Sequence, residues 1–250
     1  MASAVQAFSE AFSSYKASVA GYAVYSVILV IASMALSFFT ALCLGIFGIV
    51  SLGSVANVLA SDGSIGVAAI GLGVSVIALL LGLLAVLWVS SGLHGAYLST
   101  LNGFISKRNQ SLGAFFLCVP KFAVPIMLIS IICGVLVGAP LVLVMALAPT
   151  LGQIFSIAAI LLIILYVAVA AFLLIFAIPA AVVDNKGPIS AIRVSVAASL
   201  HNTVQVFIFI AIAAVLAIPA LVPFFNLLYA PLFYLPLTTS ALLRLYRVAR

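Results

Sequence analysis

The sequence predicts an all-helical (all-α) integral membrane protein, and three observations lead to that class. Of the 250 residues, 68% are hydrophobic and only 5% are charged, whereas a soluble domain carries about 25% charged residues. The mean hydropathy is +1.52. The apolar residues form continuous runs, several of which reach the roughly 20 residues that a helix needs to cross a bilayer, and they do not alternate with polar residues as the strands of a membrane barrel do.

The chain begins with an amphipathic segment, residues 4–19. Its apolar residues recur at steps of three and four, with Phe8 and Phe12 on the stripe and Glu10 off it. This spacing predicts one face of a helix, of the kind that lies on a membrane surface. The segment lacks the basic start and compact apolar centre of a secretory signal, so we expect the mature protein to retain it.

Six membrane-spanning helices follow in the prediction. The segment 51–66 is small, polar and contains several glycines, which predicts a loop between the first two spans. The second apolar run is longer than one bilayer-crossing helix requires, so we expect it to tilt or to project into water near its end. Pro120 and Pro125 predict a bend at the start of the third span. The predicted spans are 21–49, 67–103, the segment from this bend to about 147, 154–181, 203–222 and 227–245.

Two further interfacial helices are predicted. One covers residues 111–122, where aromatic and aliphatic side chains share a helical face. The other covers 188–202 after a Gly187-Pro188 turn, and its proline suits the first helical position; a polar loop with a chance apolar stripe is the other interpretation. Each interfacial helix precedes a pair of spans, as in the internal repeats of many membrane proteins. We therefore predict a threefold repeat, residues 4–103, 111–181 and 187–246, within a single domain of residues 1–250.

Basic residues gather on one side of this predicted topology. With both termini on the same face, all nine lysines and arginines fall in inner segments, and the outer turns carry none. Such an asymmetry marks the cytoplasmic side, so the sequence predicts a multi-pass protein of the cytoplasmic membrane with both termini in the cytoplasm. The basic face, which we expect to bind anionic lipid or a partner protein, comprises Lys107, Arg108, Lys186, Arg193, Arg244, Arg247 and Arg250.

Residues that could carry chemistry are scarce. The chain has three acidic residues, none of them near the centre of a predicted span. His94 and His201 lie near span ends, where a structural role is the favoured interpretation and anion binding the other one. The three cysteines lack metal-type spacing, and the sequence contains no nucleophile elbow or phosphate-binding loop. We therefore expect no enzymatic activity, no cofactor and no metal; an enzyme acting on lipid headgroups would need His94, His201 and Asp184 to converge.

Small residues within the spans predict close helix packing. Gly134 and Gly138 have the spacing at which helix backbones can approach each other, and Gly95 can serve the second span in the same way. Packing within the chain is the favoured interpretation, and a contact between subunits is the alternative. Prolines inside the spans predict kinks or breaks, and they are Pro140, Pro219, Pro231 and Pro236.

The segment PAAVVDNKGPISAIRVSVAASLHN carries a family resemblance. It places Pro179 at the end of a span, then the turn Asp184-Asn185-Lys186-Gly187-Pro188, then a helix with Ala191 and Ser195. In these residues it resembles the six-span membrane domain associated with some glycerophosphodiester phosphodiesterases, and related uncharacterised bacterial and archaeal membrane proteins. The likeness is sharp over this segment and loose elsewhere. It implies an architecture and brings no settled activity with it.

These observations favour a non-enzymatic membrane subunit that forms or scaffolds a transport or translocation assembly. Packing surfaces, a pore lining and a basic inner face are what a chain without catalytic groups can offer. The expected partners are membrane lipids and other membrane subunits or further copies of the chain. A self-contained transporter or channel for a small or lipid-like substrate is the alternative. Passage of nucleic acid past the basic face is a third and more remote one.

Overall fold

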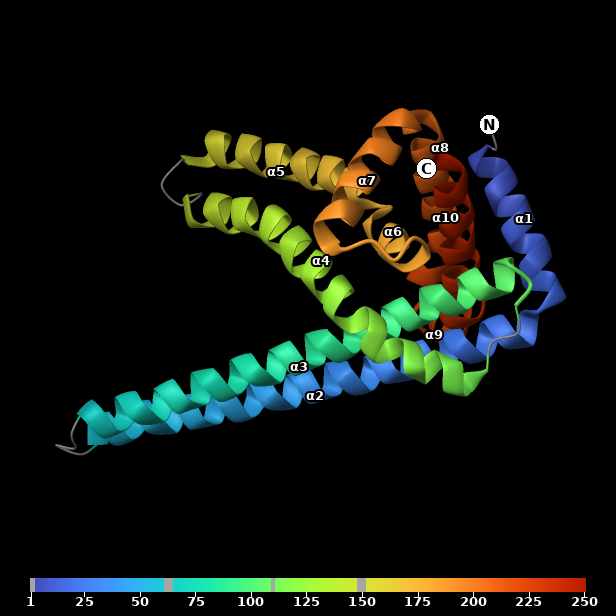
Figure 1. Cartoon of the computed structure of the whole chain (residues 1–250). Helices are drawn as coiled ribbons and strands as arrows, with labels where there is room; N and C mark the ends of the chain where they lie inside the picture. Colours follow the sequence, from blue (N-terminus) through green and yellow to red (C-terminus); the bar gives the residue numbers. More distant parts are fainter. Residues whose placement is uncertain (1–2, 61–64, 109–110, 148–151) are drawn as a thin grey trace.

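The computed structural model describes residues 3–60, 65–108, 111–147 and 152–250, and every regular element in these ranges is helical. Figure 1 shows the arrangement. The helices are α1 (Ala4–Ala17), α2 (Val19–Ala60), α3 (Ile65–Ile105), α4 (Leu112–Leu147), α5 (Gly152–Leu174), α6 (Ala177–Val183), α7 (Pro188–His201), α8 (Thr203–Ala217), α9 (Pro223–Tyr229) and α10 (Leu235–Ala249).

Five helical stretches in the described residues are long and apolar enough to cross a membrane. They are Val19–Gly53, Leu72–Ile105, Leu112–Ala146, Ile157–Val183 and Thr203–Leu221. They coincide with the first five predicted spans. Little of their surface is buried inside the molecule, and large aliphatic side chains are exposed along all of them, as expected for helices whose solvent is hydrocarbon.

The predicted loop at 51–66 is wrong for most of its length. Helix α2 continues to Ala60 and α3 begins at Ile65; Asp62 lies outside the described residues. The small and polar residues that suggested a loop are compatible with a helix, because continuing the helix pairs every backbone group within the segment. In Figure 1 the α2–α3 hairpin consequently extends well beyond the other helices.

The predicted sixth span, residues 227–245, is not one regular helix. It is divided into α9, a π-helix at Ala230–Tyr234 and α10. Pro231 and Pro236 account for the division, because each removes a backbone N–H that an α-helix would use. Helix α10 packs against α1, α2, α3, α6 and α7. The buried apolar side chains of the core form two clusters, and α10 contributes residues to each of them.

The predicted interfacial helix at 111–122 is not a separate element either. It forms the first turns of α4, which passes through Pro120 and Pro125 as one helix and changes direction along its course (Figure 1). The other two predicted segments are separate helices, α1 and α7, and α7 has Pro188 in its first turn as predicted.

Two glycines of α3 set its approach to α4. A Cβ atom placed on Gly95 would lie 2.3 Å from Cβ of Phe122, and one placed on Gly92 would lie 2.6 Å from the carbonyl oxygen of Val119. Neither position has room for a side chain, because the α4 atoms involved belong to the backbone or to the base of a side chain. This crossing fixes the C-terminal half of α3 against α4.

At two prolines, a tyrosine hydroxyl donates the hydrogen bond that the proline cannot give to a backbone carbonyl. In a regular helix the carbonyl of Leu136 accepts from residue 140, and that residue is proline, which has no N–H. The hydroxyl of Tyr166 on α5 donates to this carbonyl at 2.7 Å. In the same way Pro236 leaves the carbonyl of Leu232 free, and the hydroxyl of Tyr15 on α1 donates to it at 2.5 Å.

A serine bridges the break between α5 and α6. The hydroxyl of Ser195 on α7 accepts from the backbone N–H of Phe176 at 3.0 Å and donates to the carbonyl of Leu173 at 2.7 Å. Ser195 is fully buried. A buried backbone group without a partner costs free energy comparable to a lost hydrogen bond. By bonding to both backbone groups, Ser195 reduces the free-energy cost of the break.

Candidate functional site at the basic face

Three arginines at steps of three lie at the end of α10: Arg244 and Arg247 within the helix, and Arg250 directly after it at the C-cap. They are called the α10 arginines below. Residues at this spacing lie near one another on a helix surface. Each arginine bonds to a different part of the chain: α1, α3 and the turn after α6. The arginines therefore hold α10 to three segments that are far apart in the sequence.

Arg244 binds α1. Its Nη1 lies 2.7 Å from Oε2 of Glu10, and its Nη2 donates to the hydroxyl of Ser14 at 2.5 Å. The arginine side chain is 17% exposed and the glutamate 47% exposed. A pair this accessible to solvent is worth on the order of 0–1 kcal/mol, so its main effect is to position α1 along α10.

Arg250 and Tyr246 both bind Asp184. Arg250 forms an ion pair with Oδ1, and the Tyr246 hydroxyl donates to Oδ2 at 2.6 Å. Burial and then the neighbouring carboxylate raise the pKa of the Tyr246 phenol, which keeps it a donor. Asp184 occupies the C-cap of α6 and precedes Asn185, whose φ of 49° lies in the left-handed region that asparagine tolerates better than most residues.

Of these three arginines, Arg247 is the one without a carboxylate partner among the described residues. One nitrogen, Nη2, makes all of its hydrogen bonds to described residues: to Oδ1 of Asn102 at 2.5 Å, to the hydroxyl of Ser106 at 2.7 Å and to the Asn102 carbonyl at 3.4 Å. Burial first, and then the like charges of Arg244 and Arg250, lower the pKa of the Arg247 guanidinium. It is the least compensated cation of the α10 set.

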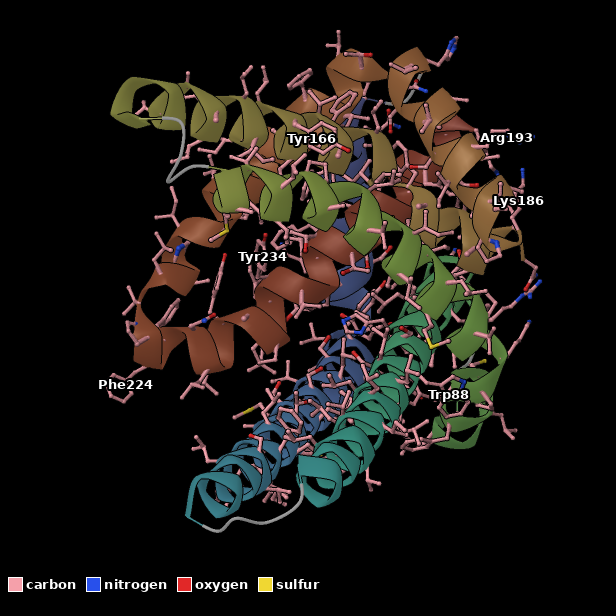
Figure 2. The ribbon with its side chains drawn as sticks, turned by 90° about the vertical axis from the view of Figure 1, so that its left-hand side faces the viewer. Trp88, Tyr166, Lys186, Arg193, Phe224 and Tyr234 are labelled. Atoms are coloured by element: carbon pink, nitrogen blue, oxygen red, sulfur yellow. The ribbon has the colours of Figure 1, made fainter. Side chains whose placement is uncertain are left out.

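The remaining residues of the basic face point outward. Lys107, Arg108 and Arg193 are exposed, and Lys186 is half-buried. Figure 2 shows Lys186 and Arg193 projecting from the same edge of the molecule. Within the described residues, the ion pairs of this protein involve only Arg244 and Arg250, so no described carboxylate neutralises the charges of these four residues.

The structure does not bring the two histidines into a site. His94 is exposed on α3 and its Nδ1 lies 2.9 Å from the carbonyl of Ser90 in its own helix. His201 is exposed at the end of α7. Neither is among the described partners of Asp184, and no group of three potential metal-binding side chains occurs in the described residues.

Gly134 and Gly138 make no close helix contact within the described residues, so their predicted packing within the chain stays a prediction. A Cβ atom at either position would meet nothing within 4 Å. The close approach occurs instead at Gly92 and Gly95, of which the sequence had suggested the second. The α4 glycines therefore form an open strip, and their alternative use, in a contact between subunits, stays a prediction.

Some residues of the site were not found from the sequence. Asn102, Ser106 and Ser14 bind arginines of α10, although nothing in the sequence pairs them with that helix. The available signal was the four-residue spacing of Asn102 and Ser106, which places both on one face of α3 close to its predicted aqueous end.

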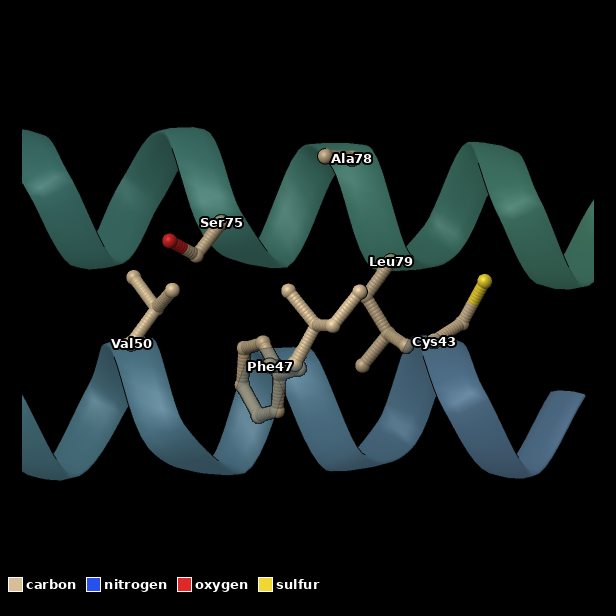
Figure 3. Close-up of a pocket in the computed structure, with 7 residues that line it drawn as sticks. Cys43, Phe47, Val50, Ser75, Ala78 and Leu79 are labelled. Atoms are coloured by element: carbon tan, nitrogen blue, oxygen red, sulfur yellow. The ribbon is translucent and has the colours of Figure 1, made fainter.

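Among the hollows that the described residues form, three lie between these helices. A cleft of about 150 Å³ lies between α1, α3 and α10, and a groove of about 360 Å³ lies between α2 and the α9–π-helix segment. A pocket of about 200 Å³ lies between α2 and α3, where Cys43, Phe47 and Val50 face Ser75, Ala78 and Leu79 (Figure 3). The last two are lined mainly by apolar side chains, and the first contains charges.

The fold thus defines the class of this protein: an all-helical chain with five helices able to cross a membrane and a cluster of arginine contacts around its last helix. No protein-family model, no curated protein sequence and no solved structure matches the chain.

Proposed function

We propose that the protein is a non-enzymatic subunit of the cytoplasmic membrane that scaffolds a transport or translocation assembly and holds anionic lipid at its basic face. The supporting observation is that the cations fall into two groups with different contacts. The α10 arginines bind the chain itself, whereas Lys107, Arg108, Lys186 and Arg193 have no acidic partner in the described residues. A cationic side chain near an anionic membrane surface contributes about 1 kcal/mol of attraction.

Exposed apolar residues support the predicted placement of α1, α7 and the start of α4 at the membrane boundary. Each of these segments presents bulky side chains that the protein does not cover. A helix lying in the interface buries such a face in the acyl region. The exposed residues are Val5 and Phe12 on α1, Leu112, Phe116 and Leu117 on α4, and Ile189 and Leu200 on α7. A sixth crossing, the threefold repeat and the cytoplasmic position of both termini belong to this proposal.

A self-contained transporter or channel is the second candidate. The groove between α2 and the α9–π-helix segment favours it, because Asn226 lines an otherwise apolar hollow and its Oδ1 is buried without a partner among the described residues. Broken helices beside such a hollow are common in transporters. A homo-oligomer formed through the open α4 glycines would fit either candidate. The basic charge is the one feature that supports the passage of nucleic acid, and it supports lipid binding equally.

The lipid proposal can be tested by replacing the four unpaired cations with glutamine (K107Q/R108Q/K186Q/R193Q). The wild-type and variant proteins would be purified in mild detergent from the same cells, and the co-purifying lipids quantified. We expect the wild type to be enriched in anionic over zwitterionic lipid and the variant to lose most of that enrichment, at roughly fivefold per charge for 1 kcal/mol.

The matched control is K16Q/K121Q. Lys16 and Lys121 are also basic but lie over the rings of Phe12 and Phe122, with 4.4 and 5.0 Å from Nζ to the ring centroid. The control should retain most of the enrichment. Equal lipid profiles for the wild type and the fourfold variant would contradict the proposal. A protein that co-purifies in stoichiometric amount with both the fourfold variant and the K16Q/K121Q control would be the scaffolded partner.

A further inference from the structure

The cleft between α1, α3 and α10 has a chemical character that the exposed bases lack. It is lined by Ala7, Glu10, Ile105, Arg244, Arg247 and Val248, and it measures about 150 Å³. Two guanidinium groups face this space together with one carboxylate. Because Glu10 is already paired with Arg244, the charge that remains in the cleft is that of Arg247.

We propose that this cleft binds one phosphate group, with Arg247 as the principal ligand. The hydrogen bonds of Arg247 all come from Nη2, so its Nη1 and Nε bind no described residue. A guanidinium presents five N–H donors in a planar fork that matches phosphate oxygens. Asn102 and Ser106 hold the group by one nitrogen and thereby fix the plane of the fork.

The electrostatic situation of the helix favours an anion at this point. The described part of the chain gives the three arginines of α10 two carboxylates, Glu10 and Asp184. Arg247 lies between the other two in the sequence and carries the unmatched charge. Charge-assisted hydrogen bonds between arginine and phosphate are among the stronger polar contacts in proteins, and a bound phosphate would relieve the repulsion along α10.

The source of the phosphate is either an anionic lipid headgroup or free phosphate. The apolar side chains of Ile105 and Val248 at the same cleft suit a lipid, whose glycerol and acyl carbons would extend over them. This inference rests on the proposed lipid-binding role, but it concerns one stoichiometric site in place of a diffuse attraction. The two can therefore fail separately.

The decisive variant is Val248→Glu, with Val248→Gln as its control. Val248 is 47% exposed, so neither change disturbs the core. The glutamate adds a carboxylate to the lining of the cleft, next to Arg247 in the sequence and one helical turn after Arg244. It opposes a bound phosphate there and replaces none of the groups that bind Arg247. Arg247→Gln is the second variant, and the thermal midpoint of each protein shows whether the chain is folded.

Binding would be measured by native mass spectrometry of protein released from nanodiscs of phosphatidylcholine containing phosphatidylglycerol, and by the thermal shift with inorganic phosphate. We expect one phosphatidylglycerol to be retained per wild-type chain, and the affinity to fall about tenfold or more in V248E and R247Q. The V248Q and K107Q/R108Q/K186Q/R193Q variants should keep this single lipid.

A thermal shift with inorganic phosphate as well would show that the phosphate group suffices, and retention of lipid alone would show that the apolar part is needed; both support the site. The inference is overturned if V248E and V248Q retain phosphatidylglycerol equally, or if the wild type neither retains phosphatidylglycerol nor shows a thermal shift with inorganic phosphate. If the fourfold variant loses the single lipid while V248E keeps it, the diffuse basic face is the lipid-binding element and the cleft is not.

Discussion

Single hydroxyl groups supply hydrogen bonds that the backbone lacks at the prolines and breaks of these helices. A proline in a membrane helix leaves a carbonyl without a donor, and no water is present in the hydrocarbon to replace it. Tyr166 and Tyr15 supply that donor to Leu136 and Leu232, and Ser195 serves both groups of the α5–α6 break. Each of these contacts joins two elements, so the local repair also fixes tertiary structure.

Replacing Tyr166 by phenylalanine should lower the free energy of unfolding by about 0.6–2 kcal/mol, because the Leu136 carbonyl loses its donor. The internal control is Pro140→Ala, which returns a backbone N–H to the same carbonyl. In the P140A background the Tyr166→Phe change should therefore cost less. The measurement is a double-mutant cycle by denaturant unfolding in detergent, and equal costs in both backgrounds would contradict the assignment.

Replacing Ser195 by alanine should cost about 1–3 kcal/mol, since it leaves the Phe176 N–H unpaired inside the core. The Leu173 carbonyl keeps only the long bond from the Ser199 hydroxyl at 3.5 Å. Ser190→Ala is the matched control on the same helix. Ser190 is exposed and its hydroxyl donates to Gly187 within the first turn, so its loss should cost less than half as much. The thermal midpoints of the two variants in one detergent give the comparison.

At the scale of elements, the position of each glycine determines whether it is a packing residue. Gly92 and Gly95 lie where α3 meets α4, whereas a Cβ atom on Gly134 or Gly138, farther along α4, would meet no described atom within 4 Å. The helix spacing is suggestive in both cases. Only the direction of α4 after its prolines decides between them.

Gly95→Ala should therefore destabilise the protein by about 1–3 kcal/mol or more through overpacking, whereas Gly134→Ala should be neutral or stabilising by up to about 1 kcal/mol through helix propensity. Unfolding in detergent measures both. If Gly134→Ala were as harmful as Gly95→Ala, the α4 strip would be a packing surface in the assembled protein, and the oligomeric state of that variant would then be expected to change.

At the scale of the whole molecule, several helices pack around α10, whereas the α2–α3 and α4–α5 hairpins extend away from it (Figure 1). Both apolar clusters of the core reach α10, and its arginines add polar contacts to α1, α3 and the turn after α6. The outer half of α2–α3 extends beyond the other helices. Lipid or a partner subunit must cover this hairpin if it crosses a membrane.

The proposed topology makes a prediction for surface labelling. In a variant whose cysteines are replaced by alanine, Lys107→Cys and Val248→Cys should react with an impermeant maleimide from the cytoplasmic side. Phe224→Cys should react from the opposite side. Phe224 is 87% exposed and projects from the first turn of α9 (Figure 2). Opposite sidedness of 224 and 248 would establish a crossing between them in spite of the π-helix, and labelling from the same side would remove the sixth span.

The sequence by itself determined the class of fold, the first five spans and the start of α7, because these depend on local composition, hydrophobic run length and the preferences of proline at a helix start. It also identified the Asp184–Pro188 segment as distinctive. The loop at 51–66 and the separate helix at 111–122 failed, because small polar residues and prolines are compatible with continuous helix when backbone groups must pair internally.

Only the tertiary structure decided which cations are free and which glycines are contacts. Arg244, Arg247 and Arg250 are indistinguishable from the other bases by sequence, yet they bind Glu10, Asn102 and Asp184 from elements remote in the chain. Such pairings depend on where helix axes cross, and that is set by the sum of many packing contacts and proline bends. No local pattern encodes them, which is why the most specific candidate site of this protein emerged from its three-dimensional arrangement.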